Sequence, residues 1–232
     1  MSETQDKESM ETTPKKQLNL HWNTVPKPTK KALDFLSEQK WLSDSGWYLA
    51  GGTALALQAG NRTSVDLDFF TTKSKFLADA VIGNFTGNNN WHADSEEDNT
   101  IYGKLLGAKV SFIAYPFFVP KQDFLTYGTV KILRPLDIAV MKVIAVSQRG
   151  RKRDFFDLYW CAHHLEPLDK ILPRLKEQYP SVAHDYHHII KSLAYFEDAE
   201  SDPPLMLHFD VSWEQVKAFF ISEVERLAFN YV

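Results

Sequence analysis

The sequence predicts an α/β fold, more closely α+β, in which a small mixed-sheet core flanked by helices is followed by a helical C-terminal region. Segments that alternate apolar and polar residues lie in the first 134 residues, and apolar residues recur at helical spacing after that. A glycine pair also separates a short apolar run from good helix formers. The 232 residues are 44% hydrophobic and 13% aromatic, which suffices for a large core and excludes a disordered or fibrous chain.

The formal net charge of −4 gives no overall attraction for nucleic acid, although a local basic patch can still bind it. The single Cys161 cannot form an internal disulfide, which indicates a reducing compartment. No apolar run approaches the roughly 20 residues that span a bilayer, and residues 1–16 lack the apolar stretch of a secretory signal. The chain is therefore expected to be soluble, cytoplasmic and without a membrane partner.

Three regions are expected: a mobile polar tail over 1–28, a core over 29–134 and a helical region over 135–232 that completes a cleft. In the core, helical spacing and a Thr29 cap predict the first helix, while period-two alternation and glycine turns predict strands and a hairpin. The expected helices cover 29–40, 53–59 and 74–85, a loop covers 83–90, and the expected strands cover 47–50, 65–70, 101–105, 109–113 and 130–133.

Beyond residue 134 the pattern is helical throughout. Pro135 suits a helix start, and the break at Asp202-Pro203-Pro204 separates the last helix from the others. The expected helices cover 136–148, 154–164, 168–179, 181–196 and 212–229.

A glycine pair and a carboxylate pair suggest chemistry. Gly51 and Gly52 open a helix, where free backbone amides and the helix dipole favour a phosphate, and Thr53 can add a hydroxyl. Alternation over 65–70 places Val65, Leu67 and Phe69 on one strand face, and Asp66 and Asp68 on the other. Two such carboxylates can hold Mg²⁺ together with substrate phosphates.

Each of these features also has an ordinary structural interpretation. A bare Asp-x-Asp can be a solvated strand face, two glycines after a strand can mark only a turn, and Thr53 can be a plain helix cap. Lys142 lies within an otherwise apolar helix, where it needs a partner or a route to water along its aliphatic stem. Asp154 and Asp157 share the first turns of the next helix, where the dipole alone stabilises acids.

The wider string of residues resembles a known family. Gly51-Gly52, a thirteen-residue gap and Asp66-Leu67-Asp68 resemble the signature of the DNA polymerase β-like nucleotidyltransferase superfamily. The fuller match resembles its AbiEii-type branch, which includes toxins of abortive-infection toxin-antitoxin systems. It covers roughly 47–159 and consists of the strings 50–57, Arg62, 64–70, 109–112, Lys142 and 153–159.

The resemblance implies an enzyme that depends on Mg²⁺ or Mn²⁺ and moves an NMP from an NTP to an acceptor, releasing pyrophosphate. The implied acceptor is a tRNA 3′ end, and the implied partner of the toxin is a cognate antitoxin protein. The residues implied to bind nucleotide are Gly51, Gly52, Thr53, Arg62 and Arg153. The residues implied to be catalytic are Asp66 and Asp68, which bind the metal, Lys142, which neutralises phosphate charge, and Asp154 and Asp157, which orient Lys142 or assist the attacking group.

Two alternatives stay open at this point. Antibiotic-modifying enzymes that share the superfamily core transfer nucleotide to a small hydroxylated molecule. The hairpin strand also carries Ser111, where the superfamily often has a third carboxylate, so a degenerate protein that binds nucleotide or RNA without chemistry is conceivable. The basic turn over 149–153 suits either phosphate contact or plain solvation, because it lacks interleaved aromatic residues.

Overall fold

The computed structural model describes residues 19–85 and 91–231, and it contains one mixed sheet of seven strands. The strands are β1 (Tyr48–Ala50), β2 (Leu67–Thr71), β3 (Trp91–Glu97), β4 (Thr100–Leu105), β5 (Ala108–Ala114), β6 (Leu125–Tyr127) and β7 (Val130–Ile132). Their order across the sheet is β3-β4-β5-β2-β1-β7-β6, with β2 antiparallel to β1 and parallel to β5. The predicted fold class is confirmed.

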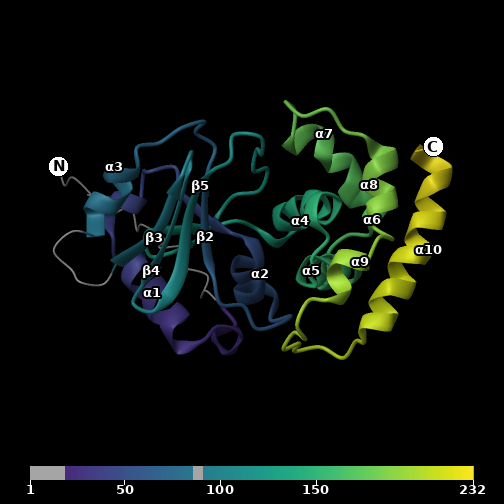
Figure 1. The fold of residues 1–232 in the computed structure, drawn as a ribbon, viewed down its shortest axis with the longest axis horizontal. Coiled ribbons are helices and arrows are strands. Elements are labelled where there is room, and N and C mark those ends of the chain that lie inside the picture. Colours follow the sequence, from purple (N-terminus) through teal and green to yellow (C-terminus); the bar gives the residue numbers. More distant parts are fainter. Residues whose placement is uncertain (1–18, 86–90, 232) are drawn as a thin grey trace, which may run out of the picture.

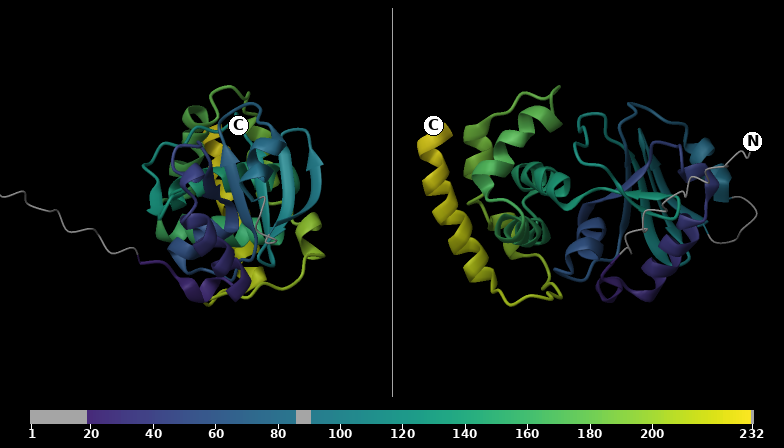
Figure 2. Two further views of the ribbon diagram at one scale, coloured as in Figure 1. Left: turned by 90° about the vertical axis from the view of Figure 1, so that its left-hand side faces the viewer. Right: turned by 180° about the vertical axis from the view of Figure 1, so that it is seen from behind.

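The helices fall into a group around the sheet and a separate C-terminal group. The α-helices are α1 (Lys27–Ser37), α2 (Gly51–Ala59), α3 (Ala78–Ile82), α4 (Pro135–Arg149), α5 (Lys152–His164), α6 (Leu168–Ile171), α7 (Leu175–Gln178), α8 (Tyr186–Ser192), α9 (Glu197–Glu200) and α10 (Trp213–Tyr231). In Figure 1, α1 and α3 lie on the outer side of the sheet and α4 to α10 form the C-terminal group. Figure 2 shows from behind that α10 lies farthest from the sheet.

Helix α2 joins the two groups. It packs against β1 and β2 on one side and against α4 and α5 on the other. Four consecutive residues, Ala54 to Leu57, are fully buried, as expected for a helix that is covered on all sides. Its N-terminus, where Gly51 follows β1 directly, is therefore held between the sheet and the helical region.

Several expected boundaries differ from the structure. Residues 1–18 of the expected tail and residues 86–90 of the expected loop lie outside the described residues. Residues 19–28 are not a free tail, because Leu20, Thr24 and Val25 are buried against the core. Helix α1 begins at Lys27 after Pro26, and the Thr29 hydroxyl donates to the Val65 carbonyl instead of capping the helix.

Longer expected helices are interrupted. Of the helix expected over 74–85, only α3 and a 3₁₀ turn, Gly83–Phe85, form. Pro173 divides the helix expected over 168–179 into α6, a 3₁₀ turn and α7, because proline cannot donate the next helical hydrogen bond. The helix expected over 181–196 is shorter, since the Asp185 side chain caps α8 at its start.

Two strands were not expected, β3 and β6. Six of the seven residues of β3 are exposed, so the strand carries no buried alternating face and is formed by its pairing with β4.

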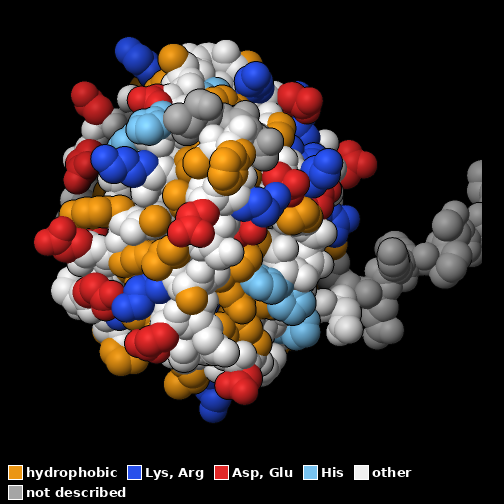
Figure 3. Space-filling model, turned by 90° about the vertical axis from the view of Figure 1, so that its right-hand side faces the viewer, with side chains coloured by type: hydrophobic (Ala, Val, Ile, Leu, Met, Phe, Trp, Pro, Cys, Tyr) orange, Lys and Arg blue, Asp and Glu red, His pale blue; other side chains and the backbone are white. Residues whose placement is uncertain are grey.

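The side of the molecule that carries α10 is shown in Figure 3. Apolar side chains lie among charged ones there, and Ile221 and Phe229 of α10 are exposed. Among the described residues, no helix is both long and apolar enough to cross a bilayer.

Candidate active site

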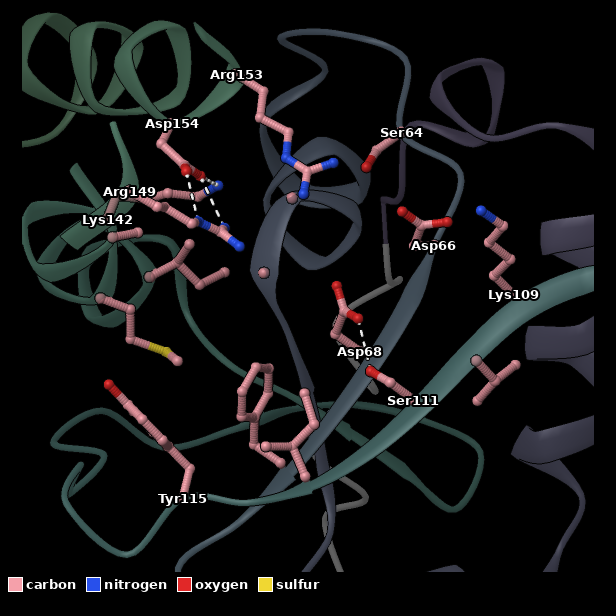
Figure 4. Close-up of a pocket in the computed structure, with 18 of the residues that line it drawn as sticks. Ser64, Asp66, Asp68, Lys109, Ser111, Tyr115, Lys142, Arg149, Arg153 and Asp154 are labelled. Atoms are coloured by element: carbon pink, nitrogen blue, oxygen red, sulfur yellow. Dashed lines mark hydrogen bonds and ion pairs between the residues drawn. The ribbon is translucent and has the colours of Figure 1, made fainter. Parts of the chain in front are cut away.

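A cleft of about 560 Å³ lies between the sheet and the helical region. It is lined by the start of α2, by β2, β4 and β5, and by α4 and α5. Figure 4 shows side chains from both groups of helices and strands facing one another across it. Residues far apart in the chain thus meet at the place where the sequence predicts a site.

The glycine pair forms one end of this cleft. Gly51 has φ +70°, a conformation that L side chains rarely adopt, and a Cβ there would lie 3.2 Å from Asp68 Oδ2. No side chain of the described residues caps α2, so amide groups of its first turn remain available to an anion.

The two predicted carboxylates both line the cleft and point into it (Figure 4). Asp68 lies on β2, level with Ala50 of β1 and Ser111 of β5. Asp66 lies just before β2, and its backbone carbonyl accepts a hydrogen bond from the Thr53 hydroxyl. The alternating face is shorter than predicted, because Val65 also precedes the strand and is 48% exposed.

Ser111 is the neighbour of Asp68 at the position of the missing third carboxylate. Its hydroxyl donates to Asp68 Oδ1 at 2.7 Å. Burial raises the pKa of the Asp68 carboxyl, the hydrogen bond from Ser111 opposes this rise, and the charge of Asp66 adds to it. A cation between the two carboxylates would relieve the unfavourable burial of negative charge.

Thr53 does not face the cleft. It is buried, its hydroxyl bonds the Asp66 carbonyl, and it lies 2.9 Å from the Ser64 hydroxyl. The predicted contact between Thr53 and a phosphate is therefore wrong for this structure, and Thr53 instead holds the segment that carries Asp66.

Asp157 is the centre of a buried ion cluster. Its carboxylate accepts two hydrogen bonds from the Arg62 guanidinium, at 2.8 and 2.7 Å, and one from Asn61 Nδ2 at 2.9 Å. Lys142 Nζ lies 2.7 Å from the same carboxylate. Burial alone would raise the pKa of Asp157, but the charges of Arg62 and Lys142 outweigh burial and hold that pKa well below its usual range.

Lys142 bridges Asp157 to Asp154. Its ammonium lies 2.7 Å from Asp154 Oδ1, and Arg149 Nε lies 3.1 Å from Asp154 Oδ2. Burial again opposes ionisation, but Lys142 and Arg149 lower the pKa of Asp154 below its ordinary value. Lys142 is only 5% exposed, so its charge is paired in the interior and does not reach water along the aliphatic stem.

This cluster changes the expected roles of two residues. Arg62 lines the cleft, but its guanidinium is occupied by Asp157, so it positions the cluster and has few donors left for nucleotide. Asp157 is fully buried, pairs with Lys142 and is not among the residues that line the cleft. Asp154 and Lys142 do line the cleft.

Two cations of the basic turn are paired within the protein. Arg149 pairs with Asp154 and Arg151 pairs with Asp202, both at 3.1 Å, while the Lys152 ammonium donates to the backbone carbonyls of Glu200 and Asp202. Arg153 is different, because it is exposed, lines the cleft and forms no ion pair or hydrogen bond among the described residues. Figure 4 shows its guanidinium reaching into the cleft.

Several residues that line the cleft were not predicted from the sequence. Lys109 is exposed and points into the cleft near Asp66 (Figure 4). Lys109 could have been predicted from the period of two along β5, because residues two apart share a strand face and Lys109 lies two before Ser111. Tyr115, Phe70 and Met141 line the other end, and no spacing rule links these three residues before the chain is folded.

The donor set fits a hard divalent cation. Asp66 and Asp68 supply carboxylate oxygens, which Mg²⁺ prefers, and waters and phosphates commonly complete its shell. Within residues 19–85 and 91–231, no group of three or more His, Cys, Asp or Glu side chains could hold a metal ion. The other ligands of such an ion would be water and phosphate oxygens.

Gly52→Ala should destabilise the protein through Arg62. A Cβ at Gly52 would clash with Arg62 Nη2 and lie 3.1 Å from Ser64 Oγ. Because that guanidinium is held by buried Asp157, we expect the free energy of unfolding to fall by about 3 kcal/mol. The control is Gly83→Ala, whose Cβ would meet nothing within 4 Å. Equal melting temperatures for the two variants in calorimetry would contradict this assignment.

A mixed sheet that presents two carboxylates to the glycine-rich start of a helix, with a helical region across the cleft, defines the nucleotidyltransferase class. MenT4, a nucleotidyltransferase toxin from Mycobacterium tuberculosis H37Rv, shares the fold. It aligns with a TM-score of 0.52 over 87% of this chain and 84% of its own, at 14% identity. JHP933 from Helicobacter pylori aligns with a TM-score of 0.48 and 21% identity, over 88% of this chain and 97% of its own.

The sequence comparisons identify the family. The family model described as "Nucleotidyl transferase AbiEii toxin, Type IV TA system" matches residues 34–101 and 108–230. An uncharacterized protein of Aquifex aeolicus (strain VF5) is 35% identical over 193 residues, which are 79% of this chain and 89% of that protein. The chain belongs to the AbiEii nucleotidyltransferase toxin family and is a nucleotidyltransferase, as the resemblance predicted.

Proposed function

We propose that this nucleotidyltransferase moves an NMP from an NTP to a tRNA 3′ end and releases pyrophosphate, with Mg²⁺ or Mn²⁺ held by Asp66 and Asp68. One observation carries the proposal. Two carboxylates, an uncapped helix start and cations with free donors converge on a single cleft. Phosphoryl chemistry needs this combination, because catalysis depends on positioning and charge neutralisation.

The phosphate chain would be held by backbone and cations together. Gly51 and Gly52, at the start of α2 where no side chain caps the helix, line the cleft, and the Arg153 guanidinium reaches into it. Lys142 has three donors and uses two of them on Asp154 and Asp157, so one remains for a phosphate oxygen. In the cluster three cations, Arg62, Lys142 and Arg149, face two carboxylates, which leaves one positive charge beside the cleft.

The bound metal would neutralise phosphate charge and polarise the phosphorus that is attacked. The chain's own residues have separate tasks. Asp66 and Asp68 would hold the ion, and Ser111 keeps Asp68 oriented toward the cleft through its hydrogen bond. Asp157 acts as a positioning residue, because it fixes Lys142 and Arg62 from behind.

A nucleic-acid acceptor is favoured by charge. Although the whole chain carries −4, the exposed Lys109 and Arg153 both line the cleft. Such cations bind a phosphate backbone more readily than a small, often cationic, hydroxylated molecule. The family description supports a toxin role, for which we propose a cytoplasmic location and a cognate antitoxin.

The test is incubation with each α-labelled NTP, Mg²⁺ and total RNA, followed by a sizing gel. We expect label in the tRNA band with one or more NTPs, and none after EDTA treatment or with Asp68→Asn. Label on small molecules alone would support the antibiotic-type alternative. Tight NTP binding without label on any acceptor would support a binding protein without chemistry.

A further inference from the structure

The cleft has a polar end and an apolar end. Along β2, Asp68 is followed on the same face by Phe70, and along the neighbouring β5, Ser111 is followed by Ile113. Residues two apart on a strand lie about 6.6 Å from each other. One step along both strands therefore changes the lining from carboxylate and hydroxyl to aromatic and aliphatic carbon.

Helix α4 forms the opposite wall of the cleft. Met141 lines its first half, Lys142, Ile144 and Ala145 follow, and Gln148 and Arg149 line its last turn. With a rise of 1.5 Å per residue, Arg149 lies about 12 Å beyond Met141 along the helix axis. Figure 4 shows Tyr115 at one end of the cleft, and Lys142, Arg149, Arg153 and Asp154 toward the other end.

Tyr115 closes the apolar end as a fixed wall. Its ring centroid lies 5.8 Å from that of Phe70 and 6.1 Å from that of Tyr179. Its hydroxyl donates to the Tyr179 hydroxyl at 3.4 Å, and Tyr179 is only 2% exposed. The ring is thus held from behind by a buried neighbour, while it remains partly exposed toward the cleft.

We propose that Phe70, Ile113, Tyr115 and Met141 form a base subsite, in which the nucleobase of the NTP stacks against Tyr115. The inference rests on the proposed function and assigns the orientation of the nucleotide in that site. The triphosphate extends from the base subsite past Asp68 toward Arg149 and Arg153. The reverse orientation would place phosphates against aliphatic carbon without hydrogen-bond partners, which is costly.

The test compares two ligands in the presence of Mg²⁺ and without acceptor: ATP or another NTP, and inorganic tripolyphosphate, which has no base. Stacking on one aromatic ring is worth about a ten- to hundredfold gain in affinity. We expect the wild-type protein to bind the NTP at least about tenfold more tightly than tripolyphosphate. Tyr115→Leu should remove most of this advantage and leave tripolyphosphate affinity unchanged within about twofold.

Three further variants sharpen the result. Arg153→Ala should weaken both ligands by the same factor, because it acts at the phosphate end. Tyr102→Leu is the matched control, since Tyr102 lines the cleft from β4 outside the base subsite and should leave the NTP advantage unchanged. Met141→Ala replaces Tyr115→Leu if the latter fails to fold, and it should lower the NTP advantage in the same direction.

The outcomes separate the two proposals. Equal affinity of the wild-type protein for NTP and tripolyphosphate overturns the base subsite and leaves the proposed function standing. The base subsite is also overturned if Tyr115→Leu still binds NTP more tightly than tripolyphosphate by the wild-type factor. That result would assign the apolar end of the cleft to the acceptor, and loss of the preference for NTP in Tyr102→Leu instead would place the base near Tyr102. Absence of binding by either ligand overturns both proposals.

Discussion

Asp68→Asn should abolish nucleotidyl transfer, with a fall in kcat/KM of about a thousandfold or more, and should not lower the melting temperature. Asparagine keeps the shape of the side chain and can still accept the hydrogen bond from Ser111. It removes one of the two charges that would hold the divalent ion. Because burial raises the pKa of Asp68, the carboxylate is costly in the free protein, so its loss should leave stability equal or slightly higher.

Asp66→Asn should have an effect of the same kind, and Asp94→Asn supplies the control. Asp94 also lines the cleft, but it lies on β3 and its nearest cation is Lys104, at 4.0 Å. Transfer by Asp94→Asn should stay within about threefold of wild type. Wild-type turnover in Asp68→Asn would show that the metal site is assigned to the wrong residues.

Lys142→Met should destabilise the protein strongly as well as slow the reaction. The substitution leaves Asp154 buried with Arg149 alone and removes one of the cations that pair with Asp157. Breaking a buried ion pair by removing one partner costs about 3 to 5 kcal/mol. For a chain of this size the melting temperature should fall by about 6 to 20 °C, and kcat/KM measured well below that temperature should fall by about a hundredfold or more.

Two comparisons isolate the cause. Lys191→Met changes the same residue type at an exposed position of α8 and should leave both melt and turnover near wild type. Adding Asp154→Asn to Lys142→Met removes a buried negative charge that Arg149 alone would balance, so the double variant should melt above the single one. A Lys142→Met protein that melts like wild type would mean that the buried cluster does not form in solution.

The elements that were predicted well depend on residues that are close together in the sequence. Pro135 and the apolar spacing after it predicted α4 to within a residue at each end, because capping and helical periodicity act over a few positions. The hairpin of β4 and β5 followed from alternation on both sides of Gly107. In contrast, β3 has no buried face and is formed by its pairing with β4, so no local sequence pattern predicted it.

The residues of the candidate site also divide into those that the sequence could predict and those that it could not. Gly51, Gly52, Asp66 and Asp68 could be selected together, because the strand, turn and helix that carry them lie within eighteen residues. The role of Thr53 could not, since its hydroxyl turns toward a carbonyl that only the folded segment brings near. Lys142 was recognised as a charge that needs explaining, but only the family resemblance, and no spacing in the sequence, pointed to Asp154 and Asp157 beside it.

The sequence by itself determined the class of fold, the helical second half and the glycine and carboxylate pairs, because each is set by spacing over short distances along the chain. Only the tertiary structure decided that the Arg62 guanidinium binds the carboxylate of Asp157, 95 positions later, and that Arg153 forms no ion pair or hydrogen bond with the part of the chain that the structure describes. It also decided that Tyr115, Phe70 and Met141 enclose one end of the cleft. The physical reason is that the partners of a buried charge or ring are the groups that pack next to it in the folded protein. Packing depends on the whole chain.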